Sequence, residues 1–314
     1  MTTPDHAASP LEGVTQHATS PAPSSPEAAH KLNAVVTLCN MVSPWLMILQ
    51  VAPDGWDLPR FVPGQFATLG LYGSASRCAL AEPEGPAPNP TALIRRGYCI
   101  ASSSNNREFF EFYIHLVPEG ALTPRLFNLE IGDRIWLADK ISGSFTFEDV
   151  PEDGNVVLIA TGSGLAPYVS MLSTHVKFTS QRRVAVLHGA RHSWDLAYRS
   201  ILMTMQGLRN NFTYLPVISR QKQEPVPWAG AVGHVQDLWK GGAIARAWNA
   251  QPTPEDTHVF LCGSPHMIED TAAMLAGGIQ RTHEQYTGTN SRREILARRL
   301  VVSGRRRIST LLVL

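Results

Sequence analysis

The sequence predicts two domains of different class, an antiparallel β-barrel followed by a Rossmann-like parallel α/β domain. From Leu32 to about Val150, short apolar runs are separated by closely spaced turn residues, which is typical of a barrel. After Val150, near-continuous apolar runs alternate with helical segments, which favours a parallel sheet covered on both faces. With 314 residues, the chain is long enough to form two separate cores.

Six apolar runs are the expected strands of the barrel. They are Ala34–Leu38, Trp45–Val51, Gln65–Leu71, Tyr98–Ser102, Phe109–Val117 and Arg134–Ala138. The segment between Tyr72 and Leu93 is rich in Pro, Gly and Ala and is longer than an ordinary hairpin. We expect this segment to be a surface excursion.

The second domain is expected to begin after a linker, Pro151-Glu152-Asp153-Gly154. Its expected strands are Val156–Ala160, Val184–His188, Thr213–Ile218 and His258–Cys262, and its expected helices are Tyr168–Val176, Trp194–Met205, Val235–Lys240 and Pro265–Leu275. Open parallel sheets bind nucleotides beyond the carboxyl ends of their strands, so we expect a site at that edge.

The two ends of the chain differ from both domains. Residues 1–31 are rich in Ala, Ser, Pro and Thr without a periodic apolar pattern, so we expect a disordered leader. The domains are then expected at 32–150 and 151–280, followed by a basic tail at 281–314. This tail holds eight arginines against Glu284 and Glu294, a net charge of +6.

Composition argues against several classes of protein. A net charge of +1 and a pI near 7.8 give no reason to expect nucleic-acid binding. No stretch approaches the ~20 apolar residues of a membrane span, and no secretory signal is expected. The four cysteines, Cys39, Cys78, Cys99 and Cys262, have no CxxC spacing and no metal or iron–sulfur signature, so we expect no bound metal. Free thiols fit a reducing cytoplasm.

Arg96-Gly97-Tyr98-Cys99 is the first motif that indicates chemistry. In a strand, Arg96 and Tyr98 share one face, and Gly97 and Cys99 share the other. A guanidinium can donate two parallel hydrogen bonds to phosphate oxygens, and the aromatic ring can lie on a flat cofactor. An edge-strand arginine beside a core tyrosine is the structural alternative.

A glycine-rich turn after the first strand of the second domain is the other motif, Thr161-Gly162-Ser163-Gly164-Leu165-Ala166-Pro167. Such a strand-to-helix turn can present backbone N–H groups and a helix N-terminus to a nucleotide. Glycines in a turn also serve geometry alone.

Together, and in this order, the two motifs resemble those of the ferredoxin/flavodoxin–NADP⁺ reductase family in its compact bacterial form. The resemblance extends from about Leu32 to about Leu275. It implies FAD on the barrel, NADP(H) on the α/β domain and an NADPH oxidoreductase activity. A hydride would pass between NADP(H) and flavin N5, and single electrons would pass between the flavin and a separate ferredoxin or flavodoxin. We expect a cytoplasmic monomer.

Other functions stay open at this point. The chain could be the reductase component of an oxygenase, or a flavin or ferric reductase. It could also be a redox-impaired, flavin-binding regulatory protein.

The resemblance assigns the FAD site chiefly to the barrel. Arg96 would pair with the pyrophosphate and Tyr98 would stack on the isoalloxazine. A Gly-x-x-Thr turn that ends at Thr123 would meet the pyrophosphate, with Thr123 as helix N-cap and Pro124 as first helical residue. The full expected set is Arg96, Gly97, Tyr98, Cys99, Tyr113, His115, Gly120, Leu122, Thr123 and Ser163.

The expected NADP(H) site lies on the second domain and comprises Gly162, Gly164, Arg191, Ser219, Arg220, His234, Gly263, Ser264 and Met267. Arg191, Ser219 and Arg220 match positions that bind the 2′-phosphate, where an NAD-specific site would more often have an acidic residue. His234 stands where the family often has arginine. Imidazole is only partly charged near neutrality, so the preference for NADP(H) could be weakened. Arg191 and Arg220 would also be unremarkable as surface residues.

Cys99 and Cys262 are the expected catalytic residues. Cys99 stands where the family has a serine whose hydroxyl can hydrogen-bond flavin N5, and a thiol is larger and a weaker donor. Cys262 would approach the reactive carbon of the nicotinamide, and the following Ser264-Pro265 would cap and start a helix. For both cysteines, a buried packing thiol is the alternative.

The basic tail is the main departure from the family, whose bacterial members commonly end in an aromatic residue over the second flavin face. Tyr286 is a candidate for that role but matches no motif. A genuine extension would explain the loss of resemblance, as would an altered reading frame near Gly278.

Overall fold

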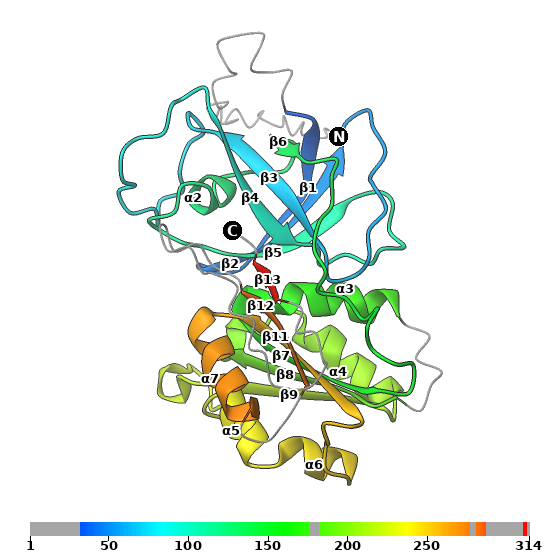
Figure 1. Cartoon of the computed structure of the whole chain (residues 1–314). Coiled ribbons are helices and arrows are strands. Elements are labelled where there is room, and N and C mark those ends of the chain that lie inside the picture. Colours follow the sequence, from blue (N-terminus) through cyan, green and yellow to red (C-terminus); the bar gives the residue numbers. More distant parts are fainter. Residues whose placement is uncertain (1–31, 176–181, 277–280, 287–309, 313–314) are drawn as a thin grey trace, which may run out of the picture. The chain divides into compact units, whose positions relative to one another are not determined.

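The computed structural model describes residues 32–175, 182–276, 281–286 and 310–312 (Figure 1). The expected leader at 1–31 lies outside the described residues. The described chain forms one antiparallel sheet and one parallel sheet, as the sequence predicts.

The first sheet contains β1 Ala34–Ser43, β2 Leu46–Pro53, β3 Phe66–Tyr72, β4 Leu93–Cys99, β5 Phe110–His115 and β6 Arg134–Leu137, with the short helix α2 Thr123–Leu126 after β5. Its strand order is β4-β3-β6-β1-β2-β5, and every pair is antiparallel. A bridge between Ile100 and Phe112 joins the two end strands, so the sheet closes into a barrel. The prediction of an antiparallel β-barrel is confirmed.

The second sheet contains β7 Asn155–Thr161, β8 Val184–Ala190, β9 Phe212–Ile218, β10 Ala231–Val232, β11 Thr257–Gly263, β12 Arg281–Tyr286 and β13 Thr310–Leu312. The helices are α3 Ala166–Thr174, α4 Arg199–Leu208, α5 Val235–Lys240, α6 Ala243–Trp248 and α7 Pro265–Ala276, with 3₁₀ turns η1 Gly162–Leu165, η2 Ser193–Asp195 and η3 Gln221–Gln223. The order is β10-β9-β8-β7-β11-β12-β13, with parallel pairs throughout. The strands that follow β7 are added on one side of it up to β10 and on its other side from β11, so the strand order reverses between β7 and β11.

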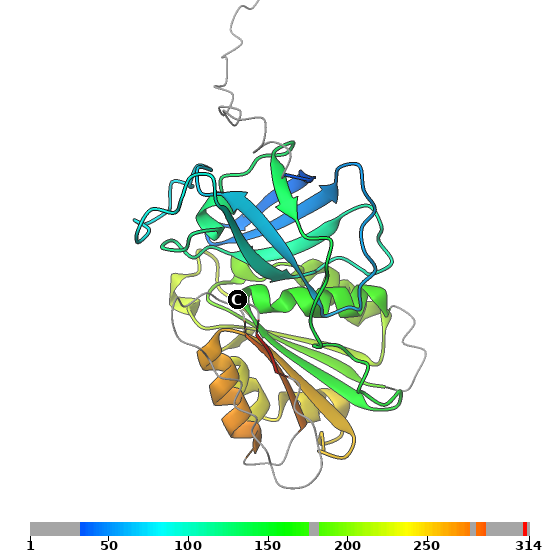
Figure 2. The same ribbon diagram turned by 45° about the horizontal axis from the view of Figure 1, so that its top comes forward.

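Residues of β7 alternate between two cores, which explains why this strand is apolar along its whole length. Val156 and Leu158 pack with α3 and α4, whereas Val157 and Ile159 pack with α5, α6 and α7. The first of these cores also includes barrel residues, and in both ribbon views α3 lies between the barrel and the sheet (Figures 1 and 2). The barrel and the α/β sheet are therefore joined through shared apolar packing.

The strand expected at Ala34–Leu38 is longer in the structure and continues to Ser43, and two other predicted elements are shifted or broken. The strand expected at Tyr98–Ser102 runs instead from Leu93 to Cys99, because β4 pairs with β3 along its whole length. The first half of β4 was not predicted, because the stretch Arg95-Arg96-Gly97 interrupts the apolar run.

The helix expected at Trp194–Met205 is also broken. Tyr198 has a left-handed backbone (φ 59°), and α4 begins only at Arg199. The Tyr198 hydroxyl donates to Glu111 on β5 at 2.8 Å, and its ring packs edge-on against Tyr113. These contacts with the barrel override the local helical pattern.

Two segments of the expected basic tail extend the parallel sheet. The backbone of Tyr286 pairs with Gly263 at the carboxyl end of β11, whereas its side chain lies outside the described residues. The predicted domain boundary at 150/151 falls between β6 and β7 and stays a prediction.

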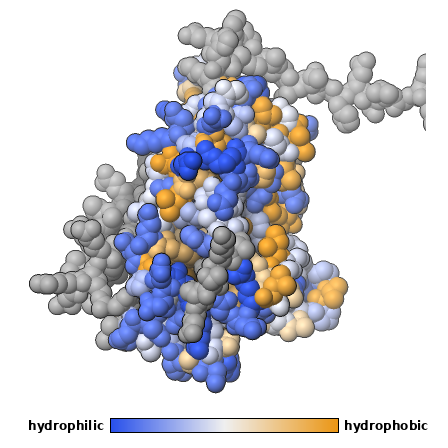
Figure 3. Space-filling model, turned by 90° about the vertical axis from the view of Figure 1, so that its right-hand side faces the viewer, coloured by the Kyte–Doolittle hydropathy of each residue, from blue (hydrophilic) through white to orange (hydrophobic). Residues whose placement is uncertain are grey.

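The surface carries both polar and apolar side chains. On the face shown in Figure 3, hydrophilic residues dominate and apolar side chains gather along one edge. Among the described residues, no helix combines the length and the apolar character needed to cross a membrane.

Candidate functional site

A cavity of about 1110 Å³ lies where the barrel faces the carboxyl ends of β7, β8, β9 and β11. Its barrel side comes from the β1–β2 turn, β4, β5 and the segment after β5. Its sheet side comes from residues at and just after the ends of the four parallel strands, and from α5 and α7. Typical small-molecule pockets have volumes of roughly 300–1,000 Å³, so this cavity is large enough for an extended ligand.

On the barrel side, β4 brings Arg96 and Tyr98 to the cavity, as the alternation of strand residues predicts. The Arg96 Nη1 atom donates to the Arg95 carbonyl at 2.7 Å. Burial raises the pKa of Tyr98 well above its usual range, so its ring stays neutral. Gly97 does not border the cavity. Cys99, expected on the opposite face, does border it, because β4 ends at this residue.

The expected N-cap at Thr123 is wrong. The cap position is Leu122, and Thr123 is the first residue of α2. The Thr123 hydroxyl accepts from the Val117 N–H at 3.0 Å and donates to the Val117 carbonyl at 3.1 Å. Thr123 and Val117 both border the cavity, whereas Gly120 and the buried Leu122 do not. The hydroxyl therefore closes the turn instead of capping the helix.

The glycine-rich turn lies between β7 and β11, at the reversal of strand order. Gly162 and Ser163 border the cavity, but Gly164 does not. A Cβ atom on Gly164 would lie 2.2 Å from the Cys262 carbonyl oxygen. Glycine at this position therefore lets η1 pack directly against β11.

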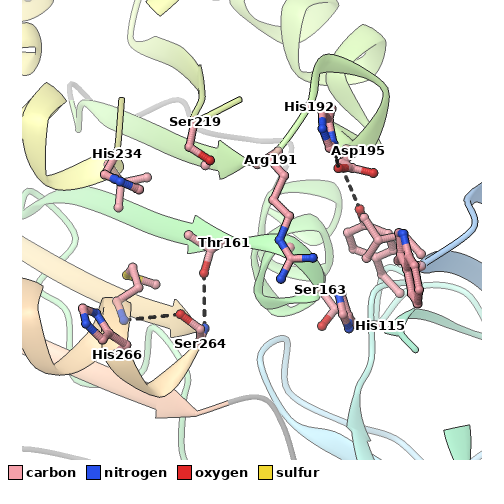
Figure 4. A pocket seen from close by; sticks show the side chains of 18 of the residues that line it. His115, Thr161, Ser163, Arg191, His192, Asp195, Ser219, His234, Ser264 and His266 are labelled. Carbon is pink, nitrogen blue, oxygen red and sulfur yellow. Dashed lines mark hydrogen bonds and ion pairs between the residues drawn. The ribbon is translucent and has the colours of Figure 1, made fainter. Parts of the chain in front are cut away.

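The start of α7 is tied to the end of β7. The Ser264 Oγ accepts from the Met267 N–H at 3.3 Å, which confirms the predicted cap, and the Ser264 N–H donates to the Thr161 hydroxyl at 3.2 Å (Figure 4). Ser264 and Met267 border the cavity, whereas Gly263 does not. A Cβ atom on Gly263 would meet the Thr161 hydroxyl at 2.2 Å, so close packing explains this glycine.

Cys262 is not on the cavity wall, contrary to its expected approach to a ligand. Its side chain is fully buried and is hydrogen-bonded to Cys99, which does border the cavity. Burial, together with this hydrogen bond, raises the pKa of Cys262 well above its usual range. Cys262 is therefore a neutral thiol behind Cys99, and its catalytic role stays a prediction.

The residues expected at the 2′-phosphate lie in two places. Ser219, Arg220 and His234 border the sheet side of the cavity. Arg191 also borders it, but its side chain points away from Ser219 and His234, toward Ser163 and His115 (Figure 4). Burial lowers the pKa of His115, and the nearby positive charge of Arg191 lowers it further.

An aromatic part of the wall was not predicted from the sequence. His192 stacks on Trp194 with ring centroids 4.4 Å apart, and its Nδ1 lies 3.2 Å from Asp195 Oδ2. The Tyr113 hydroxyl donates to the Asp195 carbonyl at 3.1 Å, which connects β5 to this segment. Trp45, in the β1–β2 turn, also lines the cavity. The position of residues 192–195 after the carboxyl end of β8 is the signal that could have identified them.

Charged residues on α5 and α7 were also missed. Lys240, Asp237, His266 and Asp270 border the cavity, and His266 Nδ1 lies 2.8 Å from Asp270 Oδ2. Asp237 Oδ2 accepts from the backbone N–H of His234 at 2.7 Å. A carboxylate therefore stands beside one of the expected phosphate-binding residues.

Comparison with known proteins agrees with this arrangement. Residues 158–273 match the family model described as the oxidoreductase NAD-binding domain. The ferredoxin–NADP reductase A of Sorangium cellulosum is 30% identical over 226 residues, covering 69% of this chain and 73% of that protein. The chain belongs to the ferredoxin–NADP reductase family.

Another relative in the family, the flavodoxin/ferredoxin–NADP reductase of Shigella flexneri, is 29% identical over 213 residues, which is 67% of this chain and 77% of that protein. The crystal structure of a ferredoxin–NADP⁺ reductase from Neisseria gonorrhoeae, with bound FAD and NADP, matches with a TM-score of 0.66. At 22% sequence identity, this match covers 81% of this chain and 97% of the other. It shows that the fold is shared.

Proposed function

We propose that the protein is an FAD-dependent reductase that transfers electrons between NADP(H) and a separate ferredoxin or flavodoxin. The observation that carries this proposal is the single cavity that joins Arg96 and Tyr98 of the barrel to the carboxyl ends of the parallel strands. Both expected cofactor sites open into this one space, and direct hydride transfer needs the two reacting groups in contact.

The barrel side fits the diphosphate and the ring system of FAD. Arg96 uses Nη1 for the Arg95 carbonyl, which leaves further N–H donors of its guanidinium for phosphate oxygens. The neutral ring of Tyr98 is suited to stack on the isoalloxazine. The Thr123 hydroxyl is occupied by Val117, so contact of Thr123 with the diphosphate would come from its backbone.

The sheet side fits NADPH. Arg220 and His234 would bind the 2′-phosphate, together with the hydroxyl of Ser219. The carboxylate of Asp237 lies beside His234 and repels the 2′-phosphate. We therefore expect the protein to prefer NADPH but also to use NADH. Arg191 points toward Ser163 and His115, where it would meet groups that both coenzymes share.

The chain contributes positioning and the exclusion of water. Bound FAD supplies the capacity to accept a hydride and to pass single electrons to a protein partner. Cys99 borders the reacting space, and the fully buried Cys262 supports it from behind. Because its raised pKa keeps Cys262 protonated, Cys262 would act as a neutral packing partner of Cys99 and not as a nucleophile.

The cellular setting is part of the proposal. Cys39, Cys78, Cys99 and Cys262 are thiols that form no disulfide, which suits a reducing compartment such as the cytoplasm. The electron partner would be a separate small iron–sulfur protein or flavoprotein, and the reductase itself would act as a monomer.

An anaerobic titration of the purified protein tests this function. We expect about one FAD per chain, bleaching of the flavin by NADPH, and recovery of its colour when oxidised ferredoxin or flavodoxin is added. Absence of bound FAD would overturn the proposal. Bound FAD that NADPH does not bleach would support a regulatory protein, and reoxidation only by an oxygenase component, free flavin or ferric iron would support the other reductase functions.

A further inference from the structure

The loop between β3 and β4, residues 73–92, is fastened to the turn at residues 117–123, which we call the β5–α2 turn. This turn reaches the cavity through its two ends, Val117 and Thr123. None of the loop residues borders the cavity. Any effect of the loop side chains on a ligand is therefore indirect.

Arg77 of the loop holds the middle of the turn. Its Nη2 donates to the Pro118 carbonyl at 2.9 Å and to the Gly120 carbonyl at 3.2 Å, while Nη1 donates to the Glu82 carbonyl of the loop at 2.6 Å. The backbone N–H of Glu82 also donates to the Pro118 carbonyl at 3.0 Å. The loop and the turn are therefore joined by both side-chain and backbone bonds.

Arg125 of α2 binds the loop from the other side, through Glu84 and Gly73. It is 3% exposed, and its guanidinium binds both carboxylate oxygens of Glu84 at 2.8 and 2.9 Å. The same guanidinium donates to the Ala121 carbonyl of the turn at 2.6 Å and to the Gly73 carbonyl of the loop at 2.7 Å.

Glu84 provides the negative charge that both arginines share. Its Oε2 lies 2.8 Å from Arg125 Nη1 and 3.8 Å from Arg77 Nε. The hydrogen bond from Arg125 lowers the pKa of Glu84, so the carboxylate is ionised near neutral pH. Without this charge, two cations, one of them almost fully buried, would lose their counter-ion.

We propose that Glu84 is a positioning residue for FAD, which acts through Arg125 and Arg77 to fix the β5–α2 turn against the FAD diphosphate. This inference rests on the proposed function, because it takes the FAD diphosphate to lie at Thr123. Loss of the Glu84 charge loosens the β5–α2 turn and therefore weakens FAD binding. Because Glu84 itself does not border the cavity, its loss leaves the NADPH side and the reaction of bound FAD unchanged.

The decisive comparison is between Glu84→Gln and Glu82→Gln in the holoenzyme. Glu82 is an exposed glutamate of the same loop that contacts the turn only through its backbone. We expect Glu84→Gln to raise the Kd for FAD about tenfold, equivalent to about 1.4 kcal/mol. Glu82→Gln should bind FAD like the wild type, and Glu84→Asp, which keeps the charge, should recover part of the loss.

Fluorescence of FAD released on dilution gives the Kd, and stopped-flow reduction gives the KM for NADPH and the rate per bound flavin. The proposal requires an unchanged KM and an unchanged rate in Glu84→Gln. Wild-type FAD affinity in Glu84→Gln would overturn it, as would parallel losses of NADPH affinity and rate, which indicate general damage. If Glu84→Gln does not fold, Arg77→Lys replaces it, and unchanged FAD affinity in that variant would overturn the proposal.

The wild-type protein separates this inference from the proposed function. Failure of the wild type to bind FAD would contradict the proposed function itself. Wild-type FAD binding with no difference between Glu84→Gln and Glu82→Gln would contradict only the role of Glu84.

Discussion

On the barrel side of the cavity, Arg96 and Tyr98 belong to one strand, whose pairing with β3 fixes both positions. On the sheet side, Ser219, Arg220 and His234 belong to segments that follow strands, and all three are exposed. A strand holds its side chains in a set geometry, whereas residues beyond strand ends are open to solvent and to an entering ligand. The difference suits a resident cofactor on one side and an exchanging coenzyme on the other.

The charges differ in the same way. The barrel side combines one cation, Arg96, with the neutral Tyr98 and with His115, whose pKa is lowered. The sheet side mixes both signs of charge, with the cations Arg191, Arg220 and Lys240 and the carboxylates of Asp195, Asp237 and Asp270. We therefore expect substitutions on the barrel side to change FAD retention, and those on the sheet side to change the choice of coenzyme.

Arg96→Ala should have the largest effect. Hydrogen bonds to charged groups contribute about 1.5–3 kcal/mol, so we expect the Kd for FAD to rise by about 10- to 100-fold. Dilution of the holoenzyme with fluorescence detection measures it. Arg95→Ala is the matched control, because Arg95 lies over the Trp136 ring instead of bordering the cavity. Equal FAD affinity in the two variants would remove Arg96 from the site.

The stability of the parallel sheet should depend on pH through His188, which is fully buried on β8 and bound through Nδ1 to the Tyr214 hydroxyl at 3.1 Å. Burial lowers the pKa of His188 to about 3, against about 6.5 in an unfolded chain. Between these two pKa values the unfolded state binds more protons than the folded state, so the unfolding free energy decreases as the pH is lowered. This histidine alone should remove about 2 kcal/mol of unfolding free energy from pH 7 to pH 5.

Urea unfolding at pH 5, 6 and 7 measures this loss. His188→Gln should flatten the pH dependence, whereas His266→Gln, at a histidine that is 87% exposed, should keep it. A pH dependence in His188→Gln as steep as that of the wild type would contradict the assignment.

Arg220→Ala should raise the KM for NADPH about tenfold and leave the KM for NADH unchanged, because only NADPH carries the 2′-phosphate. Arg191→Ala is the control, because the backbones of Arg191 and Arg220 are hydrogen-bonded but the Arg191 side chain points to the barrel side. We expect Arg191→Ala to affect both coenzymes alike. Identical selectivity in the two variants would show that the cations do not have separate roles.

Cys99→Ser should have the smallest effect. A hydroxyl is a stronger donor than a thiol, and a neutral hydrogen bond contributes about 0.5–1.5 kcal/mol, so flavin reduction by NADPH should accelerate several-fold. The FAD content should stay the same. Stopped-flow reduction at saturating NADPH measures the rate. A lower rate would mean that contact with Cys262 has adapted the site to sulfur.

Local sequence patterns predicted correctly the elements that are determined by residues close together in the sequence. The bounds of α5 agree with its sequence pattern, and the alternation of β4 placed Arg96 and Tyr98 on the cavity. The Ser264 cap was also predictable, because its hydroxyl is free to serve the helix that follows. In these cases, nearby residues decide the structure.

Contacts between distant segments account for the failures. Thr123-Pro124 has the same local pattern as Ser264-Pro265, but Val117 takes the Thr123 hydroxyl. Tyr198 breaks the predicted helix because Glu111 of the barrel accepts its hydroxyl hydrogen. Arg191 points toward His115 of the barrel, a neighbour that no local pattern reports, and its predicted role at the 2′-phosphate stays a prediction.

The central claim is that the two sides of one cavity bind different cofactors, and four dissociation constants test it most directly. The Kd values for FAD and for NADP⁺ would be measured in Arg96→Ala and in Arg220→Ala, each against the wild type. We expect Arg96→Ala to weaken only FAD binding and Arg220→Ala to weaken only NADP⁺ binding. Equal losses of both ligands in both variants, or no loss in either, would contradict the division of the cavity.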